Sequence, residues 1–127
     1  MRPLLILSAL ALSACTTVQA SDAAPDGSLV AIGEPVRNGD AVVTPMEVGE
    51  DSRCPRGVQC VWAGRVTVLV RIERGSRSET EWVLSANGTL VGKDPFALYA
   101  ITLDEVVPEK PANTEIASAD YRFRFGT

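Results

Sequence analysis

The chain of 127 residues contains no histidine, only three cysteines and few aromatic residues. Without histidine, no Ser-His or Cys-His pair exists to activate a nucleophile. Histidine is also a frequent ligand of structural zinc, so carboxylates would have to complete any zinc site. We therefore expect neither an enzyme nor a resident metal, and we expect no cofactor.

Long apolar runs, basic clusters and phosphate loops are absent too. No apolar run reaches the roughly 20 residues that a transmembrane helix needs. Lysine and arginine do not cluster and the formal net charge is −4, so nucleic acid is not expected as a partner. Gly88 and Gly92, in NGTLVGKD, lack the spacing of a phosphate-binding loop.

Acidic residues do gather in two places, but their spacing singles out no catalytic pair. We interpret them as solvated surface acids. The two groups are Glu47, Glu50 and Asp51, and Asp104, Glu105 and Glu109.

The first residues have the order of a signal peptide: a positive Arg2, then an apolar stretch over residues 4–12 broken only by Ser8. The LSAC that follows, residues 12–15, resembles the bacterial lipobox. In that family the cysteine thiol is joined to diacylglycerol and the chain is cut just before it. An ordinary secretory signal with a chance cysteine is the alternative. We expect a signal peptide at residues 1–14, a lipidated Cys15 with a flexible tether at 15–27, and one β domain at 28–127.

Lipidation would make the membrane the first partner, because two or more acyl chains give stable attachment. The residue after the cysteine is Thr16 and not Asp. By resemblance to the sorting rule of enterobacteria, this favours the outer membrane. Without residues 1–14 the chain keeps 11 basic and 16 acidic residues, a net charge of −5. We expect an acidic, lipid-anchored domain of the bacterial cell envelope, facing the periplasm.

Alternation with a period of two predicts strands from residue 29 onward. It is clearest over residues 65–74, where Val66, Val68, Val70 and Ile72 share one face. GSRS supplies a turn into residues 79–84, which put Thr80, Trp82 and Leu84 on one side and Glu79 and Glu81 on the other. The two segments together predict a hairpin.

Further strands are indicated on both sides of this hairpin. DAVVTPMEVGE is a weaker strand in which Pro45 suits an edge or a bulge. SLVAIGEPVR supplies one or two short strands. Near the end, Tyr99, Ile101 and Leu103 share a face, as do Tyr121, Phe123 and Phe125. We expect an all-β fold, a small antiparallel sandwich or barrel of six to seven strands with one disulfide-closed loop.

Cys54 and Cys60 lie six positions apart in CPRGVQCVWAG, and three roles come into question. Zinc would lack its usual ligands, and thioredoxin-like redox chemistry uses C-x-x-C at a helix start. A disulfide suits an exported chain, since the compartment is oxidising. We expect the disulfide, with Trp62 packed against it or the core and Gly64 allowing a bend at the next strand.

The segment around these cysteines resembles a motif, D-S-R-C-P-x-x-V-x-C-x-W-A-G, of small bacterial secreted or lipoprotein β domains. Asp51, Arg53 and Cys54 open it, and Trp62 and Gly64 close it. The resemblance extends over most of the chain from about Val36 and implies the fold and the cellular address. It implies no biochemical activity.

Two interpretations of the motif remain, a structural corner and a rigid recognition loop. As a loop it would present Arg53, Arg56, Gln59 and Trp62 to an envelope protein, because a rigid loop loses little entropy on binding. We expect a non-enzymatic binding or structural module. An inhibitor of an envelope hydrolase, a lysozyme or peptidase, is the alternative.

Overall fold

The computed structural model describes residues 22–86, 89–91 and 101–126. The predicted signal peptide and Cys15 lie outside these residues, as does Tyr99. Within them the fold is all-β, as expected, and the 3-10 turn η2 (Ser118–Asp120) precedes the last strand. The described residues form no helix long and apolar enough to cross a bilayer.

Five strands form the larger sheet, in the order in which they follow along the chain. Its centre is an antiparallel meander of β2 (Ala41–Asp51), β3 (Arg65–Arg74) and β4 (Arg77–Ala86), flanked by β1 (Val36–Asn38) and β5 (Thr89–Val91). The bulge expected at Pro45 is present, because the register of β2 against β3 shifts between Pro45 and Glu47.

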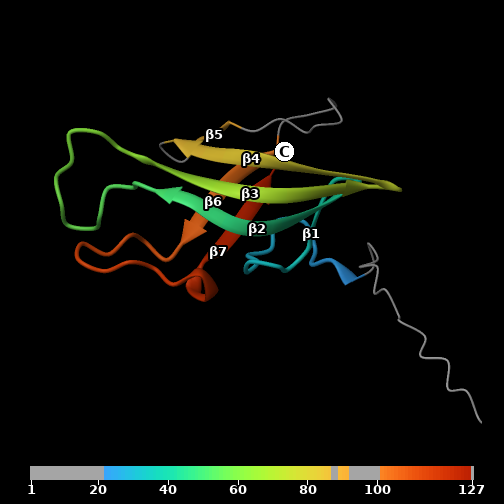
Figure 1. Ribbon diagram of the computed structural model, residues 1–127, viewed down its shortest axis with the longest axis horizontal. Coiled ribbons are helices and arrows are strands. Elements are labelled where there is room, and N and C mark those ends of the chain that lie inside the picture. Colours follow the sequence, from blue (N-terminus) through green and yellow to red (C-terminus); the bar gives the residue numbers. More distant parts are fainter. Residues whose placement is uncertain (1–21, 87–88, 92–100, 127) are drawn as a thin grey trace, which may run out of the picture.

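A second, two-stranded sheet packs across the first. It pairs β6 (Thr102–Val107) with β7 (Arg122–Gly126), and Figure 1 shows both strands running steeply across β2, β3 and β4. The backbone of Val30 exchanges two hydrogen bonds of 2.9 Å with Phe123, and the Asn38 amide donates to the Gly126 carbonyl at 3.0 Å. These links join the sheets without closing a barrel.

The core lies between the two sheets and includes the alternating residues that the sequence identified, together with others such as Val36, Val43 and Val83. Its members from β3, and those around β6 and β7, are all buried: Val66, Val68, Val70, Ile72, Ile101, Leu103, Tyr121, Phe123 and Phe125. Their rings and branched chains fill the space between sheets, where each buried side chain adds about 1.5–3 kcal/mol.

The prediction of which side of β4 faces the core, the side of Thr80 and Trp82, is wrong. Val83 is the residue that faces the core, where it pairs with Val68. Trp82 pairs with Leu69 on the outer face and remains 43% exposed. Its ring lies over Gly49, since a Cβ there would come within 2.6 Å of it. The register against β3 decides the face of each residue, so Trp82, the largest side chain of β4, stays outside.

The domain begins earlier than residue 28. Ala23 is buried, the Ala24 N–H donates to the Pro35 carbonyl at 2.9 Å, and the Arg37 N–H donates to the Ala24 carbonyl at 2.8 Å. Asp26 also accepts a hydrogen bond from the backbone of Gly39 at 3.2 Å. The second half of the predicted tether is therefore bound to β1, because small residues fit beside a short edge strand.

Candidate functional site

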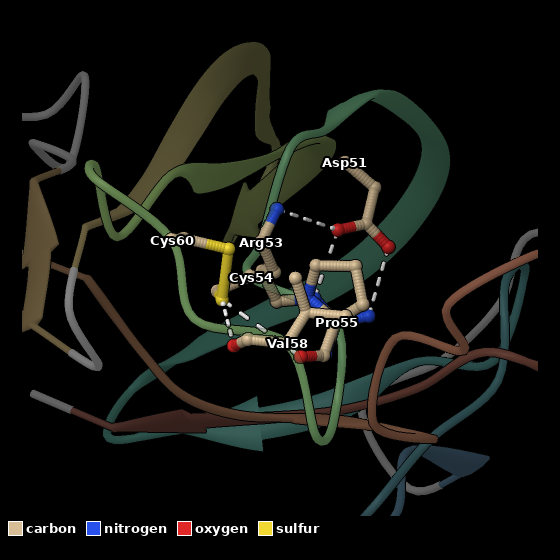
Figure 2. The surroundings of a disulfide bond; sticks show 6 residues. All are labelled: Asp51, Arg53, Cys54, Pro55, Val58 and Cys60. Carbon is tan, nitrogen blue, oxygen red and sulfur yellow. Dashed lines mark hydrogen bonds and ion pairs between the residues drawn. A yellow bond between two sulfur atoms is a disulfide. The ribbon is translucent and has the colours of Figure 1, made fainter.

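The segment between β2 and β3, residues 52–64, projects from one end of the larger sheet (Figure 1). Cys54 and Cys60 form the expected disulfide, with their Cα atoms 5.9 Å apart, as Figure 2 shows. Inside the closed ring the Val58 N–H donates to the Pro55 carbonyl at 3.2 Å, across Gly57 at φ 75°. A short covalent ring with a tight turn leaves this loop few conformations.

The neck of the loop is held by the backbone and by one serine. The Ser52 N–H donates to the Arg65 carbonyl at 2.8 Å, and the Arg65 N–H donates to Ser52 Oγ at 3.0 Å. Gly64 has φ 69°, and a Cβ there would overlap the Ser52 carbonyl oxygen. The predicted bend at Gly64 is thus confirmed, and only glycine allows the two strands of the neck to approach so closely.

Asp51 is the hub that fixes the loop to the core. Its carboxylate accepts from Arg53 Nε at 2.9 Å and Nη2 at 2.8 Å, and from the Tyr121 hydroxyl at 2.8 Å. The side chains of Arg53 and Asp51 are only 21% and 10% exposed. Arg53 also donates to the Val106 carbonyl at 3.1 Å. Arg53 therefore points inward, and the expectation that it faces a partner is wrong.

The charges of this hub stabilise one another. Burial alone would raise the pKa of Asp51, but the hydrogen bonds from Arg53 and Tyr121 outweigh it and leave that pKa below its usual value. The hydrogen bond to Asp51 raises the pKa of Arg53. Burial, with the bond to Asp51, raises the pKa of Tyr121 to about 12. At neutral pH the hub holds one carboxylate, one guanidinium and a protonated phenol.

Lys110 provides the second attachment. Its Nζ donates to the backbone carbonyl of Asp51, and its own carbonyl accepts from the Arg56 N–H at 3.0 Å. Arg56 pairs with Glu109 at 3.3 Å across a highly exposed surface, which contributes little to stability. These two hydrogen bonds thus hold the loop and the end of β2 against the segment after β6.

The outer part of the loop is apolar and open to solvent. Val61 is 89% exposed and Trp62 is 83% exposed, and Val58 and Gln59 are exposed as well. The expectation that Trp62 packs against the disulfide or the core is therefore wrong. The ring from Cys54 to Cys60 is too small to enclose an indole, and the described chain places no further layer over it. We call residues 58–62 the tip.

Asp51 is not the solvated surface acid that was expected, because its side chain is only 10% exposed and is held by Arg53 and Tyr121. Glu50, Asp51 and Glu109 each pair with an arginine. The part of the chain that the structure describes gathers no three cysteines or acids suited to a metal ion. A half-open pocket of about 360 Å³ lies beside the hub, with Lys110, Glu115 and Tyr121 in its wall.

No protein-family model, curated protein or solved structure matches the chain. The candidate site is therefore identified from the geometry of its residues alone.

The structure brings together some predicted residues and adds others. Arg56, Gln59 and Trp62 lie on the open side of the loop, whereas Arg53 faces inward. The roles of Val61, Lys110 and Tyr121 were not predicted. Two adjacent apolar residues directly after Cys60 were a readable signal for the tip. The hydroxyl of Tyr121 had none, because its partner is 70 residues away.

Proposed function

We propose that this chain is a lipid-anchored protein of the bacterial cell envelope that acts without catalysis, as a recognition module whose contact element is the tip. One observation carries the proposal: Val61 and Trp62, which directly follow the disulfide ring of residues 54–60, are 89% and 83% exposed. Exposed tryptophan is the residue most enriched among binding hot spots, and large apolar side chains left in water mark interaction sites.

The base of the loop supports recognition over simple structure. The Asp51 hub, the neck at Ser52 and the disulfide all restrict the loop before any partner arrives. A rigid contact element loses less conformational entropy on binding than a mobile one. A corner with only a structural role would gain nothing from holding an indole in water.

The address in the envelope follows from the sequence alone and is part of the proposal. The LSAC sequence and Cys15 supply the anchor, with Thr16 favouring the outer membrane. Metabolic labelling with a radioactive fatty acid tests it: the chain should incorporate label, fractionate with outer membrane, and lose both on Cys15→Ser. An unlabelled chain in the cytosol would refute it.

A photo-crosslinking amino acid at position 61 of the full chain tests the role of the tip. The matched control places the same amino acid at Ser76, an exposed position in the turn between β3 and β4, at the other end of the hairpin. We expect adducts with an envelope component from position 61 that position 76 does not give. The same adducts from both positions, or none from either, would remove the proposal.

Inhibition of an envelope hydrolase is the second candidate, favoured by the way the loop projects from the sheet (Figure 1) and by its disulfide (Figure 2). Such a loop can enter a substrate cleft without losing much entropy. Inhibition assays against a lysozyme, a serine protease and a cysteine protease decide it. The absence of inhibition at micromolar protein would rule this candidate out for the enzymes assayed.

A further inference from the structure

We infer that the partner of the tip is a protein with an uncharged, apolar cleft, and that it lies on the side of the domain away from the anchoring membrane. The inference rests on the proposed function and specifies its partner. Three features of the described residues carry it: the position of the tip, the pairing of its charges, and the chemistry of its exposed side chains.

The tip and the anchored end of the chain lie at opposite poles of the domain. Ala24 lies beside Val36, which pairs with Val43 near the start of β2, whereas the loop follows Asp51 at the end of the same strand. Val43 and Asp51 are eight steps apart along the strand, about 26 Å. Figure 1 shows the first described residues and the 52–64 loop at opposite ends of the molecule.

The anchor keeps the first pole close to lipid. The chain from Cys15 to Asp22, the first described residue, spans at most about 25 Å even when fully extended. The tip, beyond the far end of β2, is distant from the point where this tether joins the domain, so it can contact a partner while the first pole stays at the membrane. A partner reached from there faces the periplasm.

The charges around the tip argue against attraction to anionic lipid. Each arginine of the loop and its neck pairs with a carboxylate: Arg53 with Asp51 at 2.8 Å, Arg56 with Glu109 at 3.3 Å, and Arg65 with Glu50 at 3.0 Å. Anionic headgroups are recognised by clusters of unpaired lysine and arginine. The chain after residue 14 is also acidic, with 11 basic and 16 acidic residues, so an anionic surface repels the domain as a whole.

The exposed side chains of the tip are mainly apolar. Val61 and Trp62 are adjacent in the sequence and both exposed, and Val58, in the disulfide ring, is exposed as well. Apolar side chains bind by leaving water for an apolar surface, and a tryptophan at the centre of an interface contributes much of the affinity. We therefore expect Trp62→Ala to weaken binding on the order of 30-fold or more and high salt to leave it intact.

The full chain with a photo-crosslinking amino acid at position 61 tests the inference in intact cells and in membranes washed with 1 M NaCl. The expected result is one protein adduct that still forms when irradiation follows the salt wash. It should be lost when Trp62→Ala is added, and it should be absent when the photo-crosslinking amino acid is at position 76. Both substituted residues are exposed, so thermal unfolding of the variants should match the parent. A protein adduct that salt abolishes, or that persists without Trp62, overturns the inference, because the contact is then not apolar.

A second measurement separates lipid from protein. The chain has two tryptophans, so Trp82→Phe leaves Trp62 as the reporter. The lipidated full chain is placed in vesicles of phosphatidylethanolamine and phosphatidylglycerol with brominated acyl chains. Unquenched Trp62 emission supports the inference. Quenching shows that the tip enters the bilayer, which overturns the inference and leaves the tip as the contact element. No specific adduct together with no quenching removes the proposed function as well.

Discussion

Replacing Asp51 by asparagine removes the charge on which the attachment of the loop depends. The carboxylate accepts three hydrogen bonds of 2.8–2.9 Å from Arg53 and Tyr121. Bonds to charged groups contribute about 1.5–3 kcal/mol each, and breaking a fully buried pair costs about 3–5 kcal/mol. Arg53 keeps 21% exposure and a bond to the Val106 carbonyl, so part of that cost is relieved. We expect Asp51→Asn to lower the free energy of unfolding by about 2–3 kcal/mol.

Urea unfolding followed by far-ultraviolet circular dichroism measures this effect. With a slope of about 1–3 kcal/mol/M for a small domain, the midpoint should fall by about 1–2 M with the slope unchanged. The matched control is Glu50→Gln, which breaks the exposed ion pair with Arg65 and should leave the midpoint where it is. Equal midpoints for the two variants would refute the view that the Asp51 hub holds the loop.

Three further predictions concern titration, the disulfide and the neck. The pKa of Tyr121 is raised to about 12 in the folded chain, so its contribution to stability is complete below about pH 10 and is lost as pH rises toward 12. In a Tyr99→Phe variant, tyrosinate absorbance should titrate near this raised pKa. A pKa near the usual value of about 10 would contradict the hydrogen bond from Tyr121 to Asp51. Cys54→Ser and Cys60→Ser should each lower the free energy of unfolding by about 2 kcal/mol and the melting temperature by about 10 °C. Reactive thiols in the unreduced parent chain would disprove the disulfide. Gly64→Ala should lower the free energy of unfolding clearly more than Gly57→Ala. Both positions have positive φ, a strain that costs alanine about 1 kcal/mol, but only at Gly64 would the added Cβ also overlap backbone atoms. Similar melting temperatures for the two variants would show that the neck is not tightly packed.

Much of the fold was predictable because alternation reports burial directly. Val66, Val68, Val70 and Ile72 form the inner face of β3, as their spacing indicates. The face of β4 was not predictable from its own residues, since the register with β3 turns Val83 inward and leaves Trp82 outside. A local pattern fixes the period of a strand, while its phase depends on the neighbouring strand.

The site was predictable in its covalent part and less so in its contacts. The pairing of Cys54 with Cys60 followed from compartment and spacing. The inward turn of Arg53 did not, because it depends on Tyr121 and on the Val106 carbonyl, both distant in sequence. Trp62 was expected to pack because large aromatic residues usually do. The short ring was readable from the spacing of the cysteines, but only the structure shows that no other segment of the described chain covers the indole.

Hydroxyl-radical footprinting of the two tryptophans, in intact cells and in the purified chain, tests most directly the claim that the tip is a contact element. Trp82, 43% exposed on the outer face of the sheet, serves as the internal standard. In the purified chain Trp62, 83% exposed, should oxidise faster than Trp82. We expect Trp62 to be protected in cells while Trp82 is unchanged. Equal oxidation of Trp62 in cells and in the purified chain would contradict the account.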